Sequence, residues 1–335
     1  MKHYVIVGIL VILVAVLTYV GLDSVGLLPV EASAQAVPID WLWDLQVKFI
    51  SFLFALIVVP MIYSLVVFRR RKGDTTDAQH IEGNTRLEIA WTVVPLIIVL
   101  GMAYIGAQNL AETRRADPDA MVVKVTGFQW GWKFDYPEYG ISSNELYLPV
   151  NKQVLLEMTS RDVIHSFWVP EFRVKQDVVP GRTTELRITP TLVGDTYKVR
   201  CAELCGTSHA FMLAPVVVTE EAGFASWVSD QQALAAEAAQ TPEGRGQALV
   251  QANGCAACHS IDGSKGIGPT WYGVFGEQVQ LADGSTVTAD DAYLMESIRQ
   301  PQAKIVAGFE GQQMPIYGFT EEQISDIVAY IKTLR

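Results

Sequence analysis

Three long apolar runs without charged residues occupy the first third of the chain, Tyr4 to Leu22, Phe49 to Phe68 and Ile89 to Leu110. A helix rises about 1.5 Å per residue, so each run is long enough to cross a hydrocarbon core of about 30 Å. After about position 112 the sequence becomes polar and rich in turn-forming residues. The pattern therefore predicts an anchored protein with a large soluble part.

A basic cluster, Arg69 to Lys72, follows the second run directly. Basic loops resist translocation, so we expect this cluster in the cytoplasm and the third run to lead outward. Residues 37–112 would then form a transmembrane helical hairpin. The residues after about Glu112 are expected on the periplasmic or extracellular face of a bacterial inner membrane, which the chain crosses more than once.

The first run, within residues 1–36, fits either a retained helix or a signal peptide. Small residues at Ala32, Ala34 and Ala36 offer a processing site. The run is longer than the apolar core of a usual signal peptide, which favours retention.

Short runs rich in Val, Tyr, Leu and Thr fill the chain between Met121 and Thr219, for example MVVKVTG, NELYLPV, QVLLEMT, ELRITP and DTYKVR. Pro, Gly, Asn and Asp separate these runs. This spacing is typical of a β-sandwich or barrel. Residues 113–220 are therefore predicted to form an all-β domain.

The four cysteines form two close pairs, Cys201 with Cys205 and Cys255 with Cys258. Close pairs are typical of ligand or attachment sites. Disulfides are the alternative in an exported chain, but such short loops give little of the loop-closure stabilisation that disulfides usually provide.

The first pair belongs to the segment Cys201-Ala-Glu-Leu-Cys205-Gly-Thr-Ser-His209-Ala-Phe-Met212. Soft donors of this kind select copper, and a thioether is a poor ligand for zinc, the alternative metal. Cys205, His209 and Met212, with His165 upstream, resemble the ligand set of a mononuclear blue-copper site. Cys201 would be superfluous there, whereas two thiolates can bridge two copper ions, which favours a dinuclear centre.

From the second apolar run to about Thr219 the chain closely resembles subunit II of the haem-copper cytochrome oxidases. The thiol segment carries this resemblance together with four other motifs, Arg-Leu-Glu88-Ile-Ala-Trp91-Thr, Gln129-Trp130-Gly-Trp132-Lys-Phe134, Asp162-Val-Ile-His165-Ser and Val-Lys-Gln-Asp177-Val-Val-Pro-Gly-Arg182. The resemblance implies a membrane-anchored chain with a cupredoxin-like Greek-key barrel that holds a CuA centre.

The resemblance also implies a complete ligand set for two copper ions. Its members are the bridging thiolates of Cys201 and Cys205, the terminal imidazoles of His165 and His209, and weak axial donors from Met212 and the backbone carbonyl of Glu203.

Three further roles are implied by resemblance alone. The Glu203 side chain would reach a magnesium ion at the interface with the catalytic subunit, Trp130 would be the surface residue where electrons enter, and Glu88 would lie near a proton-channel mouth. Plainer interpretations exist for two of them. A tryptophan in a β-domain is often a core residue, and a carboxylate at a helix start is often a cap or a dipole partner.

A linker over residues 221–243, rich in Ala, Gln and Glu, is predicted to be a helical spacer with a break near Thr241-Pro242. The attachment signature Cys255-Ala-Ala-Cys258-His259 follows it. The two thiols are expected to bind haem c covalently, and the imidazole to be the proximal iron ligand. A thioredoxin-like alternative would need a βαβ context that this segment lacks.

Residues 244–335 resemble the class I cytochromes c, which implies an all-α domain. Met314 is predicted to be the sixth iron ligand, because Met/His coordination suits an electron-transfer haem. Met295 lies at apolar helical spacing and is predicted to be a core residue instead. By the same resemblance, the carbonyl of Pro269 is expected to hold the proximal imidazole of His259.

The last segment, Thr320 to Leu334, has the apolar spacing of an amphipathic helix. Thr320 is its predicted N-cap, with Glu322 nearby. We expect this helix to pack against the first helix of the haem domain.

The two redox sites account for all four cysteines and for three of the five histidines. His3 and His80 remain, and we expect both to be structural or solvated. These are too few histidines to ligate further haems and a third copper, so oxygen must be reduced in another subunit. The net charge of −11 gives no basic surface for nucleic acid.

The sequence therefore predicts an electron-transfer subunit of a terminal respiratory oxidase. Haem c would accept an electron from a cytochrome c, another small redox protein or a quinol-oxidising complex. The electron would pass through CuA to oxidase subunit I, which reduces oxygen to water and translocates protons together with the other subunits.

Three alternative functions compete with this prediction. A nitrous-oxide or nitric-oxide reductase component would use the same centres with another terminal substrate. A copper-delivery protein has no need of a covalent haem. A quinol-oxidase subunit lacks the copper ligands that this chain carries.

Overall fold

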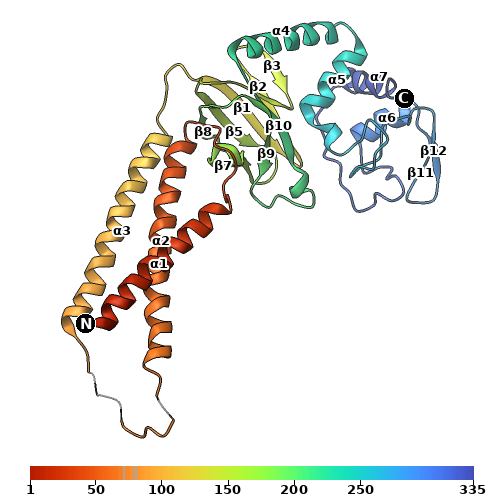
Figure 1. Ribbon diagram of the computed structural model, residues 1–335. Helices are drawn as coiled ribbons and strands as arrows, with labels where there is room; N and C mark the ends of the chain where they lie inside the picture. Colours follow the sequence, from red (N-terminus) through yellow and green to blue (C-terminus); the bar gives the residue numbers. More distant parts are fainter. Residues whose placement is uncertain (71, 78–79, 81) are drawn as a thin grey trace. The chain divides into compact units, whose positions relative to one another are not determined.

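The computed structural model describes residues 1–70, 72–77, 80 and 82–335 (Figure 1). The chain divides into two units, Met1–Arg115 and Ala116–Arg335. Arg71, a member of the basic cluster that the sequence places in the cytoplasm, lies outside the described residues.

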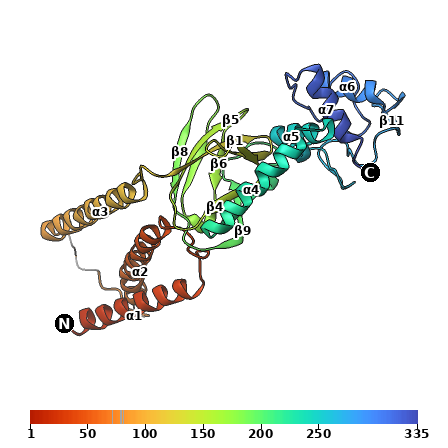
Figure 2. The same ribbon diagram turned by 90° about the horizontal axis from the view of Figure 1, so that it is seen from above.

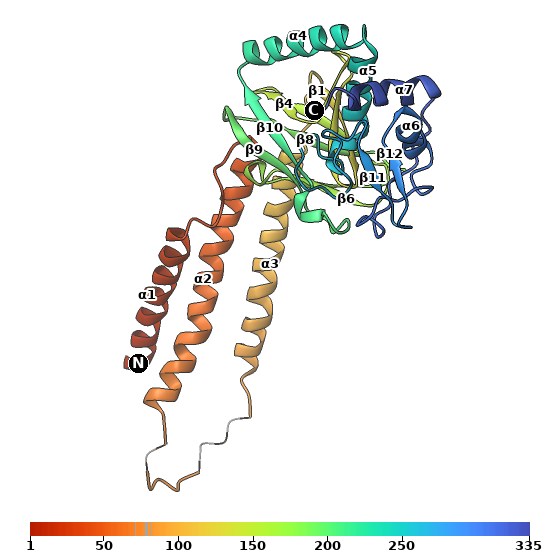
Figure 3. The ribbon, with the colours of Figure 1, turned by 90° about the vertical axis from the view of Figure 1, so that its right-hand side faces the viewer.

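Three helices make up the first unit, α1 (Lys2–Ser24), α2 (Ala36–Val67) and α3 (Thr85–Thr113) (Figure 3). Each is long and apolar enough to cross a membrane, as the three apolar runs predict. Most of their large apolar side chains are exposed, which suits a lipid environment. The chain is thus a membrane protein with a large soluble part.

Packing between α1 and α2 rests on small and branched side chains, since Val11, Ala55 and Val59 are buried together. α2 begins at Ala36, well before the apolar run that starts at Phe49, and its first turns also carry polar residues. One of them, Asp44, accepts a hydrogen bond of 2.8 Å from the Tyr19 hydroxyl of α1.

The two histidines outside the predicted redox sites behave as the sequence suggests. The Nδ1 atom of His3 lies 2.8 Å from the hydroxyl of Tyr63 and so joins α1 to α2. The exposed His80 lies 3.4 Å from a carboxylate oxygen of Glu82.

A β-domain of two five-stranded sheets opens the second unit. One sheet has the order β3-β2-β1-β5-β8 and the other the order β4-β10-β9-β6-β7. The strands are β1 (Met121–Phe128), β2 (Gly131–Tyr136), β3 (Ile141–Ser143), β4 (Leu146–Pro149), β5 (Val154–Ser160), β6 (His165–Trp168), β7 (Lys175–Val178), β8 (Thr184–Ile188), β9 (Gly194–Cys201) and β10 (Leu213–Thr219).

The core of this domain follows from the period-two pattern of its strands, because alternate residues of β5 are buried along the whole strand. Phe134, Leu156, Phe167 and Val199 are fully buried inside. The five runs that the sequence assigns to strands are β1, β4, β5, β8 and β9, and the cupredoxin-like fold is confirmed.

The predicted linker begins with helix α4 (Glu221–Ala238), which the structure attaches to the β-domain. Trp227 is stacked on Tyr147, with ring centroids 4.4 Å apart and planes 7° from parallel. Trp227 also meets Tyr136 edge-on at 5.0 Å. Figure 2 shows α4 running from the sandwich toward α5. The first part of the spacer is therefore a docked helix rather than a free one.

The C-terminal domain contains helices α5 (Pro242–Asn253), α6 (Asp291–Arg299) and α7 (Glu321–Ile331). Thr320 caps α7 in a capping box with Gln323, and α7 packs on α5 as predicted. Arg245 of α5 donates to both carboxylate oxygens of Asp326 at 2.8 and 2.9 Å. The helical fold is confirmed, and a hairpin of β11 (Gln278–Gln280) and β12 (Thr286–Thr288) adds to it.

Candidate copper and haem sites

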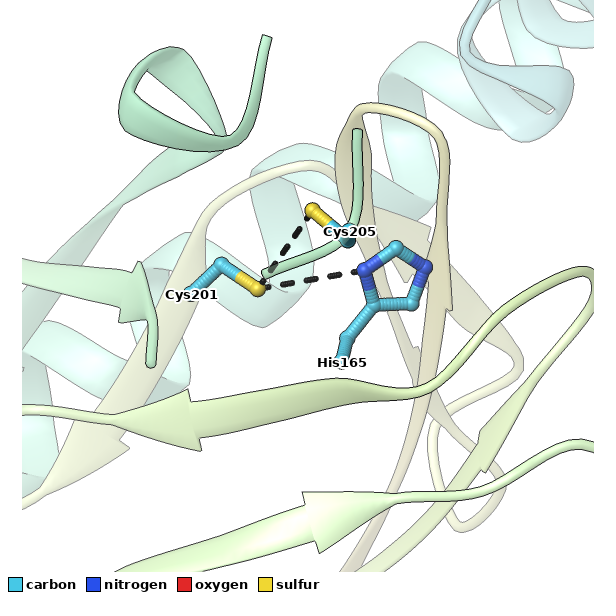
Figure 4. Close-up of side chains that lie close together, drawn as sticks. All are labelled: His165, Cys201 and Cys205. Atoms are coloured by element: carbon cyan, nitrogen blue, oxygen red, sulfur yellow. Dashed lines mark hydrogen bonds between the residues drawn. The ribbon is translucent and has the colours of Figure 1, made fainter. Parts of the chain in front are cut away.

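The side chains of His165, Cys201 and Cys205 converge from the start of β6, the end of β9 and the loop that follows β9 (Figure 4). Their ligand atoms all lie within 4.8 Å of one another. The Sγ atom of Cys201 is 3.7 Å from that of Cys205 and 3.8 Å from Nδ1 of His165. Adjacent strands of one sheet thus bring together residues that lie 36 positions apart in sequence.

The rest of the predicted donor set surrounds the thiol pair. Nδ1 of His209 lies 3.6 Å, and the thioether sulfur of Met212 lies 3.8 Å, from Sγ of Cys205. The backbone carbonyl of Glu203 lies 3.2 Å from Sγ of Cys201. The structure therefore gathers all six residues that the sequence predicts as copper ligands.

The donor set fits copper. Both thiols are free and buried, and their separation of 3.7 Å is far longer than the 2.05 Å or so of a disulfide. Two thiolates, two imidazoles and a thioether at this spacing are soft ligands, which select copper over zinc or magnesium. The distance between the two sulfurs therefore suits two metal ligands rather than a disulfide.

Asp162 orients the first imidazole. Its Oδ1 atom lies 2.9 Å from Nε2 of His165. An ionised carboxylate can only accept hydrogen bonds, so the Nε2 atom of His165 carries the proton. The Nδ1 atom then faces the sulfur of Cys201. Sequence reasoning named Asp162 only as part of a motif. Its spacing of three residues before His165 is the signal for this contact.

Burial and hydrogen bonds shift the pKa values of His165, Cys201 and Cys205 in different directions. Burial works to lower the pKa of His165, but hydrogen bonds to Asp162 and Cys201 outweigh it and raise that pKa. Burial works to raise the pKa of Cys201, yet the hydrogen bond to His165 brings that pKa below its usual value. Burial and the neighbouring Cys201 raise the pKa of Cys205. Cys201 is therefore the more acidic of the two thiols.

The ligand loop is held by two side chains of the turn between β1 and β2. Gln129 Nε2 and Trp130 Nε1 both donate to the carbonyl of Cys205, at 2.7 and 3.2 Å. Gly206 allows this close approach, since its φ is +123° and a Cβ there would lie 3.0 Å from Cζ2 of Trp130. The half-buried Trp130 thus lies directly on the ligand loop and not in the core.

The attachment signature follows α5 directly in the second soluble domain. Cys255 and Cys258 are free thiols, and Nδ1 of His259 donates to the carbonyl of Pro269 at 2.8 Å, as the sequence predicts. Because Nδ1 carries the proton, Nε2 is left to bind a metal. Burial lowers the pKa of His259, which keeps the imidazole neutral, as a ligand must be.

Trp271 is a residue of this site that sequence reasoning missed. Its ring is stacked on the imidazole of His259, with centroids 4.6 Å apart and planes 12° from parallel. No local spacing pattern points to it, because the contact depends on the fold of the loop between the two residues. Free thiols, a fixed imidazole and an unprotonated Nε2 fit a covalently bound haem.

The two candidate methionines lie in different surroundings. Met295 lies on α6 and packs against the core of the domain, as predicted. Met314 is partly buried in the irregular segment that precedes α7. Its assignment as the sixth iron ligand stays a prediction.

Two further predicted roles belong to side chains that lie outside these clusters. Glu88 is in the first turn of α3, where its side chain accepts a hydrogen bond from the backbone N–H of Asn84 at 3.3 Å. This contact supports the plainer role of a cap. The side chain of Glu203 is exposed. The channel-mouth and magnesium assignments stay predictions.

Protein-family models match three parts of the chain. The transmembrane domain of cytochrome C oxidase subunit II matches residues 20–107, its periplasmic domain matches residues 140–221, and cytochrome c matches residues 244–335.

Relatives of known name agree with these matches. A cytochrome c oxidase subunit 2 from Alkalihalophilus pseudofirmus is 32% identical over 307 residues, which cover 88% of this chain and 88% of the relative. The protein of the same name from Thermostichus vulcanus is 36% identical over 264 residues, 63% of this chain and 80% of the relative. The crystal structure of the periplasmic domain of subunit II of cytochrome oxidase from Bradyrhizobium japonicum is 35% identical, with a TM-score of 0.33 over 36% of this chain and 96% of that one.

Proposed function

We propose a route for electrons through this chain on the premise that the chain belongs to the cytochrome c oxidase subunit 2 family. It is an electron-transfer subunit of a haem-copper terminal oxidase. In our proposal an electron enters at a haem c in the C-terminal domain, passes to copper in the β-domain and leaves to the subunit that reduces oxygen. The observation behind this proposal is the thiol pair with four further donors around it, in a chain that also carries Cys255-Ala-Ala-Cys258-His259.

Two copper ions would be held by the thiol cluster. Cys201 and Cys205 would bridge them, His165 and His209 would be terminal ligands, and the weak axial donors would come from Met212 and the carbonyl of Glu203. When bound, copper and haem c supply one-electron acceptors and donors. Hydrogen bonds from Asp162, Gln129 and Trp130 hold the ligand residues in place, which would keep rearrangement on electron transfer small.

Neighbouring residues would hold the metal and haem ligands in position. Asp162 holds the tautomer that leaves Nδ1 of His165 for copper. Gln129 and Trp130 hold the carbonyl of Cys205 and so the position of its thiolate. In the haem domain, Cys255 and Cys258 would bind the haem covalently and His259 its iron, with Met314 opposite.

The finer assignments are part of the same proposal. Trp130 would accept electrons at the surface of the β-domain, Glu203 would share a magnesium ion with the catalytic subunit, and Glu88 would lie near a proton-channel mouth. The soluble domains would face the periplasm or the exterior of a bacterial inner membrane. The upstream donor would be a cytochrome c, another small redox protein or a quinol-oxidising complex.

Copper counting and EPR spectroscopy on the purified oxidase complex test the copper assignment. We expect two copper ions per chain at this site and a mixed-valence signal, which Cys201→Ser and Cys205→Ser each abolish. His80→Ala is the matched control, because it removes an exposed imidazole far along the sequence from the cluster. A single copper ion, or a mixed-valence signal that survives in either serine variant, would refute the assignment.

A further inference from the structure

Within the second unit, the segment that leads into the haem attachment site lies against the β-domain. Gly254 is the residue before Cys255, and a Cβ there would lie 2.1 Å from Cε2 and 2.3 Å from Cζ of Phe128. The Phe128 ring therefore packs directly on the Gly254 backbone. Phe128 is only 7% exposed, although it is the last residue of β1 and borders the turn to β2.

A second contact lies beside the first. Arg161 of the β-domain donates a hydrogen bond of 3.2 Å to the carbonyl of Ala252, near the end of α5. The guanidinium carbon of Arg161 lies 5.3 Å from the centre of the Phe128 ring. A cation over an aromatic face holds both side chains in one arrangement, and a helix C-terminus attracts positive charge. We call these four residues, Phe128, Arg161, Ala252 and Gly254, the docking seam.

The docking seam is connected to the copper ligand loop through the residues that follow Phe128 and Arg161 in the sequence. Phe128 is followed by Gln129, whose side chain donates to the carbonyl of Cys205 at 2.7 Å. Arg161 is followed by Asp162, which binds His165 and also accepts a hydrogen bond of 2.7 Å from the Gln129 backbone. A contact at the seam is therefore one residue away from groups that touch copper ligands.

We propose that Phe128 and Arg161 form a docking surface for the haem-attachment segment of the same chain. The electron from the tethered haem then reaches the copper ligand loop through Phe128 and Gln129, and not first through Trp130. With haem c and copper bound, one electron would leave the haem and be taken up by the copper, so that no bond is made or broken. Phe128 and Arg161 act as positioning residues. This inference rests on the proposed function and replaces one part of it, the entry of electrons into the β-domain at Trp130.

The test uses the full chain in its purified complex, with variants Phe128→Ala, Arg161→Ala and Arg161→Lys. Lys152→Ala, which removes an exposed cation elsewhere on the β-domain, is the matched control. After flash reduction of haem c, we expect transfer to copper to slow by about tenfold or more in both alanine variants, because a charge-assisted hydrogen bond or an aromatic contact is lost. Arg161→Lys should recover part of the rate, and Lys152→Ala should match the wild type.

Two further readouts separate docking from other faults. The copper EPR signal and the rate of copper reduction by a small external donor, ruthenium hexaammine, should stay unchanged in the seam variants. In the seam variants prepared without copper, protease cleavage at residues 239–241 should be faster than in the wild-type chain prepared in the same way. The reason is that the haem domain of these variants is no longer held against the β-domain.

The proposal is overturned if Phe128→Ala and Arg161→Ala both keep the wild-type transfer rate. It is also overturned if Trp130→Phe slows transfer while Phe128→Ala does not. Failure of the proposed function looks different, since haem c would then be reoxidised at an undiminished rate in the Cys205→Ser variant.

Discussion

The Trp227→Ala substitution should release α4 from the β-domain. Trp227 is 9% exposed and is stacked on Tyr147 and against Tyr136. Truncation of a buried tryptophan to alanine costs about 3–5 kcal/mol. An isolated helix of this length is only marginally stable in water, so α4 cannot offset that loss by its own hydrogen bonds.

Release would lengthen the flexible spacer between the soluble domains from residues 239–241 to residues 220–241. The entropy of closing a chain of that greater length adds about 1.8 kcal/mol, which is a roughly 20-fold lower effective concentration of the haem domain at the β-domain. The rate of electron transfer from haem c to copper should fall by up to that factor.

Flash-initiated reduction of haem c in the complex measures this rate, and protease sensitivity of residues 220–241 reports the release. Leu234→Ala is the matched control, because it removes an apolar side chain that is 58% exposed on the same helix. A Trp227→Ala chain that is cleaved faster in the spacer but transfers electrons at the wild-type rate would refute the reasoning about tether length.

Three other substitutions test separate contacts. Met314→Ala should leave haem covalently bound and lower its reduction potential in a redox titration, whereas Met295→Ala should not; the opposite result would reverse the axial assignment. Asp162→Ala should weaken copper binding about 10–100-fold in a chelator competition, because it removes the acceptor that orients a copper-binding imidazole; unchanged affinity would contradict this role. Asp326→Asn should lower the free energy of unfolding of the haem domain by roughly 1–3 kcal/mol, since it weakens a bidentate pair with the partly exposed Arg245; calorimetry showing no change would disprove it.

The features that could be predicted best from the sequence depend on residues that lie close together along the chain. The copper donors from Cys201 to Met212 lie within one short segment, so their chemistry is visible before any fold is known. The membrane helices follow from uninterrupted apolar runs, and the α7 cap follows from Thr320 and the residues just after it. Only His165 had to be found at a distance, as the upstream histidine that completes the donor set.

The features that could not be predicted from the sequence depend on contacts between segments that lie far apart along the chain. The docked state of α4 needs Tyr147, which lies 80 positions before Trp227 and on a different element. The ring of Trp271 reaches His259 only because the intervening loop folds back.

The most direct test of the proposed electron route follows haem c reoxidation by oxygen in the Cys205→Ser complex, measured by stopped-flow absorbance. An external donor should still reduce haem c, because the attachment residues Cys255, Cys258 and His259 are intact. Reoxidation should stop, since copper is the exit from this chain to the oxygen-reducing subunit. If haem c in the copper-free complex is reoxidised at the wild-type rate, electrons bypass the thiol cluster and the proposed route is wrong.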